Sequence, residues 1–129
     1  MMIRLAPALG ALLLAAAPSA GLAQSLGGDA ARGADVFQDR CTACHVLTGV
    51  GQGPSLIGVV GRKAASAPGF NYSAALQASG LVWTQPQLDR FLSGPTKLVP
   101  GTVMRATIAD AGERHDLIAY LASLRPGAH

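Results

Sequence analysis

The two cysteines of the chain stand beside a histidine in one pentapeptide, Cys41-Thr42-Ala43-Cys44-His45. Cys-x-x-Cys-His is the attachment signature of c-type haem: two thiols add to vinyl groups on one porphyrin edge, and the adjacent histidine reaches the iron. Cysteines three residues apart suit that edge when they lie on one helical turn. The motif therefore predicts one covalent haem c, attached through Cys41 and Cys44, with His45 as a metal ligand.

Other chemistries of this motif stay open as alternatives. A zinc site needs about four ligands, and His115 and His129 are the only further histidines. A thioredoxin-type dithiol is expected beside a βαβ pattern, and the sequence has no convincing strand. A plain short-range disulfide between the two cysteines is the remaining possibility.

The composition limits the class of protein. The chain has 129 residues, 50% hydrophobic and 13% charged, with a mean hydropathy of +0.33. These values exclude a disordered or strongly acidic protein and favour a single domain. The formal net charge is only +3, and no Lys/Arg cluster or series of stacking aromatics is present. We therefore expect no nucleic-acid partner.

The first residues have the pattern of a secretory signal peptide. An opening with Arg4 precedes an apolar run over residues 5–17, and Gly21 and Ala23 supply small residues at positions −3 and −1 of a cut before Gln24. The apolar run is shorter than the roughly 20 residues that a bilayer span needs. These features predict an exported bacterial protein of the periplasm.

Cleavage would divide the chain into a signal peptide, residues 1–23, and one domain, residues 24–129. Loss of Arg4 lowers the formal net charge from +3 to +2. The remaining domain is near the lower size limit for a core that is stable without help. An uncleaved segment that anchors the domain to the outer face of the inner membrane is the alternative.

Capping residues and apolar periodicity predict an all-α domain. Helices are expected from Asp29 to about Cys41, over residues 73–79, from a Thr84/Gln87 capping box to Gly94-Pro95, and from Asp110 to Pro126-Gly127. The apolar stripes of the longer helices are Gly33, Val36 and Phe37; Leu88, Phe91 and Leu92; and Leu117, Tyr120, Leu121 and Leu124. Residues 46–72 are rich in Gly and Pro and are predicted as loops, whose length is explained if they wrap around a large prosthetic group.

The second axial ligand of the iron would decide the function. Met104 is the only methionine left after cleavage, and it follows Pro100-Gly101 in a loop between two predicted helices. A thioether opposite histidine raises the reduction potential, which suits an electron carrier. His115 is the other candidate, but it stands among charged residues near a helix start, so we expect it to be solvated.

The chain resembles class I cytochromes c of the mitochondrial and purple-bacterial kind from about Gly33 to Leu124. The resemblance is carried by the haem motif and by Gly53-Pro54-Ser55-Leu56, Gly61-Arg62-Lys63, Ala67-Pro68-Gly69-Phe70-Asn71-Tyr72, Trp83, Pro100-Gly101-Thr102-Val103-Met104 and Asp116-Leu117-Ile118-Ala119-Tyr120-Leu121. It implies a fold in which the N- and C-terminal helices cross, near Gly33 and Tyr120, and loops wrap around one covalent haem.

The resemblance also implies roles for single residues. Pro54 would accept a hydrogen bond from His45, and Met104 would be the distal metal ligand. Arg62, Tyr72 and Trp83 would bind the inner haem propionate. Thr102 would bind the outer propionate; all four of these side chains have donors that suit a carboxylate.

The sequence departs from the family pattern at the distal side of the haem and on the surface. Leu76 and Phe91 stand where many relatives have an Asn and a Tyr, so we expect no buried water near the methionine. Lys63 and Lys97 are the only lysines, whereas mitochondrial members ring the haem edge with lysines. The surface that docks redox partners is therefore expected to be more apolar than in those members.

The resemblance implies a periplasmic one-electron carrier rather than an enzyme. Its partners would be membrane oxidase or reductase complexes and periplasmic dehydrogenases, which dock transiently at the haem edge. We expect a monomer that contacts a membrane only if the signal is uncleaved. The alternative is a haem peroxidase or gas-binding protein with a labile distal ligand.

Overall fold

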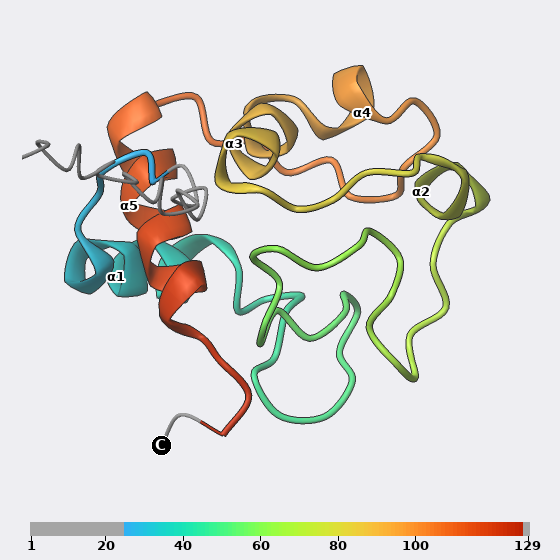
Figure 1. The fold of residues 1–129 in the computed structure, drawn as a ribbon, viewed down its shortest axis with the longest axis horizontal. Helices are drawn as coiled ribbons and strands as arrows, with labels where there is room; N and C mark the ends of the chain where they lie inside the picture. Colours follow the sequence, from blue (N-terminus) through green and yellow to red (C-terminus); the bar gives the residue numbers. More distant parts are fainter. Residues whose placement is uncertain (1–24, 128–129) are drawn as a thin grey trace, which may run out of the picture.

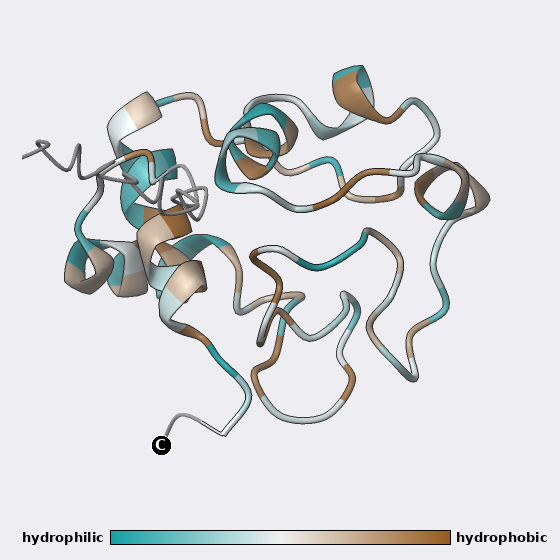
Figure 2. Cartoon of the chain, in the orientation of Figure 1, coloured by the Kyte–Doolittle hydropathy of each residue, from teal (hydrophilic) through white to brown (hydrophobic). Residues whose placement is uncertain are grey.

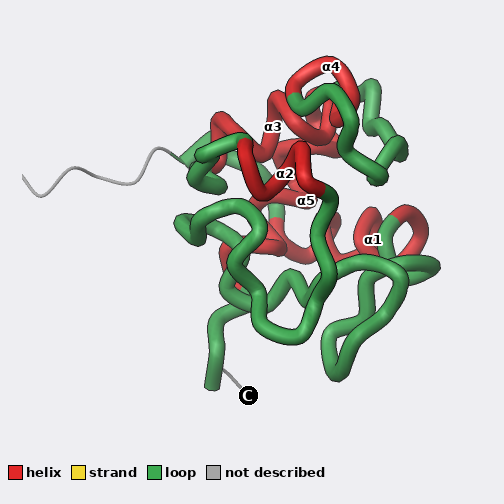
Figure 3. Tube along the Cα trace, turned by 90° about the vertical axis from the view of Figure 1, so that its right-hand side faces the viewer, coloured by secondary structure: helices red, strands yellow, loops and turns green. Residues whose placement is uncertain are grey.

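The computed structural model describes residues 25–127, which form a small helical domain with long connecting loops (Figure 1). The helices are α1 (Ala30–Arg40), α2 (Ala74–Ala78), α3 (Gln85–Ser93), α4 (Pro95–Leu98) and α5 (Ala111–Ser123). Within this described part no strand is present, as Figure 3 shows, and only an isolated bridge pairs Lys63 with Val82. The all-α prediction is therefore confirmed, while the predicted signal peptide lies outside the described residues.

Three helices begin where their capping residues predict. Asp29, Ser73 and Asp110 each accept a hydrogen bond from the backbone N–H three residues ahead, at 2.9, 3.2 and 2.8 Å. Such a bond satisfies one of the N–H groups that a helix start leaves without a partner. The starts of α1, α2 and α5 are thus local properties of the sequence.

The predicted capping box at α3 is only half formed. Thr84 Oγ1 accepts the N–H of Gln87 at 3.2 Å. The return bond is missing, because the N–H of Thr84 donates instead to the carbonyl of Val82 at 2.8 Å. A backbone carbonyl of the preceding loop therefore takes the place of the Gln87 side chain as the acceptor for the Thr84 N–H.

The prediction that the helix after Thr84 ends at Gly94-Pro95 is confirmed, but a further short helix that was not predicted begins there. The third helix does end at Ser93, but Pro95 is the first residue of the short helix α4. The carbonyl of Gly94 accepts hydrogen bonds from the N–H groups of Lys97 and Leu98, at 3.1 and 3.0 Å. Proline suits a first helical turn, since its missing N–H would have no partner there.

The first and last helices cross closely, as expected. A Cβ on Gly33 would overlap the backbone carbonyl of Asp116 and fall 2.8 Å from the Cβ of Tyr120. The Phe37 and Tyr120 rings pack beside this point with centroids 5.3 Å apart. The absence of a side chain at Gly33 is therefore what lets α1 and α5 approach (Figure 1).

Polar contacts tie the start of α1 to α5. The Asp116 carboxylate accepts the Asp29 N–H at 2.7 Å and the Arg32 Nε at 2.8 Å. The Arg32 guanidinium is also the main reason that the pKa of Asp116 is lowered, and the Asp29 N–H adds to it. One carboxylate of α5 thus binds both the residue that precedes α1 and a residue of α1 itself.

The long loop predicted over residues 46–72 is confirmed. It is fastened to the segment before α3 by backbone hydrogen bonds between Gly61 N–H and Trp83 O and between Trp83 N–H and Arg62 O, both 2.8 Å. These bonds place Arg62 and Trp83 next to each other. The loop thereby forms a wall of the molecule that faces the helices (Figure 1).

The core lies between α1, α3 and α5. Leu117 and Ile118 of α5 are fully buried, and α3 buries the predicted stripe of Leu88, Phe91 and Leu92. Its other side carries hydrophilic residues (Figure 2). Among residues 25–127, no helix combines the length and apolar character required for a membrane crossing.

Candidate functional site

A cavity of about 440 Å³ opens between the helices and the long loop. All the residues predicted to bind or attach the haem line it, although they come from segments far apart in the sequence: Cys41, Cys44, His45, Pro54, Arg62, Tyr72, Trp83, Thr102 and Met104. Its volume lies within the range of ordinary cofactor sites. The fold therefore brings the predicted set together.

The cysteines occupy the turn that ends α1. Cys41 is the C-terminal cap of the helix, and its carbonyl accepts the N–H groups of Cys44 and His45 at 3.1 and 2.8 Å. Both thiols are free, so the structure contains no disulfide between them. Burial raises the pKa of the Cys41 thiol to about 11, whereas Cys44 is exposed. The turn thus presents two thiols and an imidazole to one side of the cavity.

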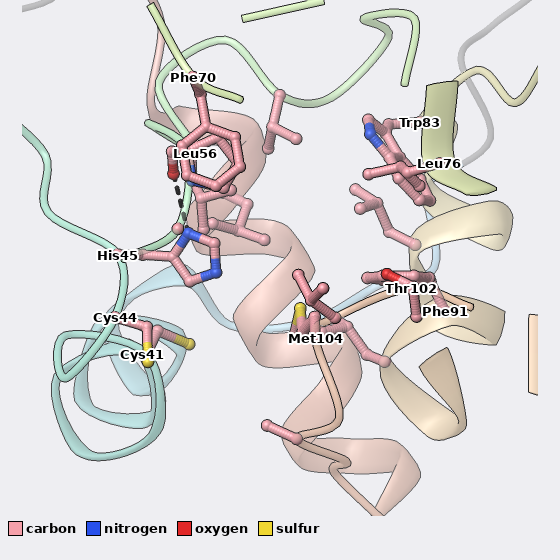
Figure 4. Close-up of a pocket in the computed structure, with 18 of the residues that line it drawn as sticks. Cys41, Cys44, His45, Leu56, Phe70, Leu76, Trp83, Phe91, Thr102 and Met104 are labelled. Carbon is pink, nitrogen blue, oxygen red and sulfur yellow. Dashed lines mark hydrogen bonds between the residues drawn. The ribbon is translucent and has the colours of Figure 1, made fainter. Parts of the chain in front are cut away.

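The orientation of His45 is fixed by its neighbours. Its Nδ1 lies 2.8 Å from the carbonyl oxygen of Pro54, and because a carbonyl can only accept, Nδ1 carries the proton. Nε2 keeps its lone pair and is turned toward the side of the pocket on which Met104 lies (Figure 4). A Cβ on Gly53 would fall 2.5 Å from His45 Cε1, so the ring needs a glycine at this position. The bond predicted for Pro54 is present.

Met104 reaches the cavity from the loop between α4 and α5. The backbone of this loop turns at Gly101, which has a φ of +92°, a conformation that glycine adopts without strain. A Cβ at Gly101 would lie 3.1 Å from the Cβ of Ala75 on α2. The loop is therefore held against α2, with the half-buried Met104 thioether inside the cavity.

Unsatisfied donors gather at another part of the wall. The Arg62 guanidinium donates to the carbonyls of Ile57 and Ser55, both at 3.0 Å, while its buried Nε has no partner. Tyr72 accepts the Ala67 N–H at 3.1 Å through its hydroxyl oxygen, which leaves the hydroxyl proton free to donate.

Two further donors, on Trp83 and Thr102, line the same cavity. The indole nitrogen of the buried Trp83 is on the ring edge turned toward the pocket (Figure 4). Thr102 is 5% exposed and is the buried polar residue of the core. The buried Arg62 Nε without a partner and the neighbouring hydroxyl and indole donors suit an anionic acceptor, and the propionates of a haem fit this description.

The family is decided by comparison with known proteins. A family model described as Cytochrome c matches residues 30–125. The chain belongs to the cytochrome c family. This cytochrome c is an electron carrier with a covalent haem c, and Cys41 and Cys44 stand in the corresponding motif.

Its relatives include bacterial and eukaryotic proteins. It is 44% identical over 101 residues to cytochrome c2 of Rhodopila globiformis, covering 76% of this chain and 95% of that protein. It is 44% identical over 97 residues to cytochrome c 2.1 of Caenorhabditis elegans, covering 73% and 87%. Among solved structures, cytochrome cH from Methylobacterium extorquens superposes with a TM-score of 0.71 at 47% identity, covering 74% and 98%.

Apart from Leu76 and Phe91, which the resemblance placed at the distal side of the haem, the apolar wall of the cytochrome c cavity was not predicted as part of the site. Leu88, Phe91 and Leu92 of α3, and Leu117 and Leu121 of α5, line the cavity. Their helical spacing indicated burial, but spacing does not distinguish a protein core from the wall of a cofactor pocket. These residues do both.

Other lining residues were not predicted as site residues either, among them Gln52, Val59, Phe70, Ser73 and Arg105. Gln52, Ser73 and Arg105 stand directly beside motif residues, and Phe70 lies within a motif.

The expectation that His115 is solvated is only partly right. Its side chain is 34% exposed, and its Nε2 lies 3.5 Å from Asp89 Oδ1. Asp89 is also bound by Arg114 Nε at 2.7 Å. His115 does not line the cavity, because it belongs to this polar contact between α3 and α5.

Proposed function

We propose that this cytochrome c is an exported, periplasmic one-electron carrier whose iron is ligated by His45 and Met104. The observation that carries the proposal is that both side chains line one cavity, with Nε2 of His45 turned toward the side that holds the Met104 thioether. A haem bound there supplies an iron centre that takes up and releases a single electron. No substrate is transformed.

The residues of the chain tune and hold this centre. The Pro54 carbonyl fixes the tautomer of His45 and makes its free nitrogen a stronger donor. The Met104 thioether favours the ferrous state and so raises the reduction potential. Arg62, Tyr72 and Trp83 donate to the inner propionate, and Thr102 donates to the outer one.

The distal side of the cavity is dry in this proposal. Leu76 and Phe91 line the wall and offer no polar atoms, and a buried water needs two to four polar partners. Exclusion of water favours the less charged iron state. Loss of a donor to the sulfur has the opposite effect, because it leaves the thioether a better ligand for ferric iron.

Export is supported by the pattern of residues 1–23. The partners that we propose are membrane oxidase or reductase complexes and periplasmic dehydrogenases, which dock at the cavity mouth. Mixing the reduced protein with such complexes and timing its oxidation would identify them. N-terminal sequencing of the exported protein tests the cut before Gln24, and an intact Met1 would show an uncleaved anchor.

Carbon monoxide distinguishes the carrier from a haem peroxidase or gas-binding protein. If Met104 occupies the distal position, the ferrous protein binds carbon monoxide poorly at neutral pH, and Met104→Ala binds it rapidly. The same substitution abolishes the weak sulfur-to-iron charge-transfer band of the ferric protein. Rapid binding by the parent protein, or a band that persists in Met104→Ala, would overturn the assignment of the ligand.

A further inference from the structure

The loop that carries Met104, residues 99–110 between α4 and α5, is held at two points on either side of the methionine. Thr102 N–H donates to the carbonyl of Val99 at 3.0 Å. Ile108 N–H donates at 2.9 Å to the carbonyl of Leu92 on α3, beside which the loop passes (Figure 1). Within the part of the chain that the structure describes, the backbone of residues 103–107 makes no hydrogen bond to another residue. The position of Met104 therefore depends on how firmly the two points are held.

A guanidinium fastens the end of the loop that follows Met104. Arg114 of α5 donates through Nη1 to the carbonyls of Ile108 and Ala109, at 2.9 and 2.8 Å. Its Nε donates to Asp89 Oδ1 on α3 at 2.7 Å. Because the guanidinium is planar and holds its N–H groups in a fixed fork, the bond at Nε determines where Nη1 points. One side chain thus connects α5, α3 and the end of the loop.

The Asp89 carboxylate is the charged partner in this arrangement. It stands three residues before Leu92, so the carboxylate and the carbonyl that accepts the Ile108 N–H lie on the same part of α3. The Arg114 side chain is only 12% exposed, and a bond between two charged groups is stronger than a neutral one. A guanidinium that lost this anion would be drawn toward water. It would then leave the two loop carbonyls.

We propose that Asp89 is a positioning residue for Met104: by orienting Arg114, it holds the end of the loop on α3 and so keeps the thioether in the cavity. The inference rests on the proposed carrier function, in which His45 and Met104 stay on the iron while one electron is taken up and released. Neither Asp89 nor Arg114 lines the cavity. Their effect therefore reaches Met104 through the loop and not by contact with the cofactor.

Amide hydrogen exchange of the ferrous protein, followed by NMR, tests the hold on the loop. In Asp89→Ala the Ile108 amide should exchange about ten-fold faster, because one charge-assisted hydrogen bond is lost. The Trp83 amide, which donates to the Arg62 carbonyl at 2.8 Å, should keep its rate. Asp35→Ala removes the same charge from an exposed site of α1 and should change neither amide. An unchanged Ile108 rate in Asp89→Ala, or equal acceleration at Ile108 and Trp83, would overturn the proposal.

Imidazole follows Met104 itself. It binds ferric iron only after the thioether has left, so its binding rate at saturating imidazole reports how fast the loop opens. This limiting rate should rise about three-fold or more in Asp89→Ala and stay unchanged in Asp35→Ala. His115 Nε2 lies 3.5 Å from the same Asp89 oxygen, and His115→Gln should leave the rate unchanged. A parental rate in Asp89→Ala, or an equal rise in His115→Gln, would contradict the inference.

A double-variant cycle shows whether Asp89 acts through Arg114. Arg114→Lys keeps the positive charge but lacks the fork that binds the carboxylate and the two carbonyls together. If Asp89 works by orienting this fork, Asp89→Ala should change Ile108 exchange little when Arg114 is already lysine. The same ten-fold acceleration in both backgrounds would show that Asp89 acts by another route and would reject the inference.

Failure of the proposed function would give a different result. If Met104 is not the ligand, the parent protein lacks the charge-transfer band and binds imidazole without a limiting rate. The exchange of the Ile108 amide does not depend on the ligand, because it reports the bonds between the loop, Arg114 and α3. The two proposals can therefore fail separately.

Discussion

Gly33 of α1 lies directly against the backbone carbonyl of Asp116 on α5, with no room for a side chain between them. The contact joins helices that are about 80 residues apart in the sequence, beside the Phe37 and Tyr120 rings, which pack at a tilt of 52°. Leu117 and Leu121 of the same helix α5 line the cavity. Helix crossing and cofactor pocket therefore share one geometric constraint.

Gly33→Ala should destabilise the protein. Alanine improves helix propensity by about 1 kcal/mol, but its Cβ would overlap backbone that cannot rotate away, and overpacking costs about 1–3 kcal/mol or more. We expect a net loss of about 1–2 kcal/mol in denaturant unfolding. Gln38→Ala, at an exposed site of α1, is the control. An unchanged midpoint in Gly33→Ala would contradict the close approach.

The Asp116 carboxylate makes stability depend on acid pH. Its pKa is lowered in the folded protein, first by the hydrogen bond from Arg32 and then by the Asp29 N–H. A lowered folded-state pKa gives a contribution that is present above the unfolded value, about 3.9, and is lost as pH falls through the folded value.

Unfolding followed by circular dichroism from pH 7 to pH 2 measures how much the Asp116 carboxylate contributes to stability at each pH. Asp116→Asn should be less stable than the parent at neutral pH, and the difference should narrow below about pH 4. Asp35→Asn, at an exposed site on α1, should change the profile little. A difference between Asp116→Asn and the parent that stays constant down to pH 2 is the result that this account does not allow.

Covalent attachment gives a direct mass signature. The two free thiols of Cys41 and Cys44 lie in one turn at the cavity edge. Mass spectrometry of the denatured, exported protein should give the polypeptide plus one haem. The double variant Cys41→Ala/Cys44→Ala should give the polypeptide alone. An apo mass for the parent, produced in a host that attaches haem, would refute attachment at this turn.

Salt should affect docking less than in a lysine-ringed relative. If residues 1–23 are removed as we propose, the chain carries a formal net charge of +2, and two haem propionates would bring it close to zero. A nearly balanced chain with two lysines attracts a partner weakly at long range, unlike a ring of lysines. Electron-transfer rates with the natural partner should therefore change little between low and physiological ionic strength, whereas a steep decline would reveal a focused basic patch.

At alkaline pH a lysine can replace the methionine in this family, and Lys97 is the candidate here. It is exposed on α4, six residues before Val103, which stands where the usual lysine is found. The ligand loop is held against α2, since Gly101 approaches Ala75. We therefore expect the transition at a higher pH than in a relative that has the Asn and Tyr.

Optical pH titration of two lysine variants tests this prediction. Lys97→Ala should abolish the lysine-ligated spectrum, and Lys63→Ala, in the distant long loop, should retain it. An unchanged alkaline species in Lys97→Ala would exclude this ligand. If the transition of the parent protein occurs at the same pH as in a relative with the Asn and Tyr, or at a lower pH, the argument from a dry pocket is refuted.

Features that depend on neighbours in the chain could be predicted from the sequence. The haem motif lies within one turn, and the caps Asp29, Ser73 and Asp110 act on an N–H three residues ahead. Their geometry is nearly independent of the rest of the fold. Thr84 also caps its helix as predicted, but the return bond from Gln87 does not form, because the Thr84 N–H donates to Val82 in the preceding loop.

Features that depend on distant segments were settled by packing. The resemblance named Arg62, Tyr72, Trp83 and Thr102, but no local pattern shows that their donors meet; the bonds between the long loop and residues 81–83 bring Arg62 beside Trp83. Likewise, the pairing of Arg40 with Glu113 and of Arg114 with Asp89 depends on the packing of α5 against α1 and α3. Local bonds are encoded within a few residues, whereas the partner of a polar side chain depends on which surfaces the whole chain brings together.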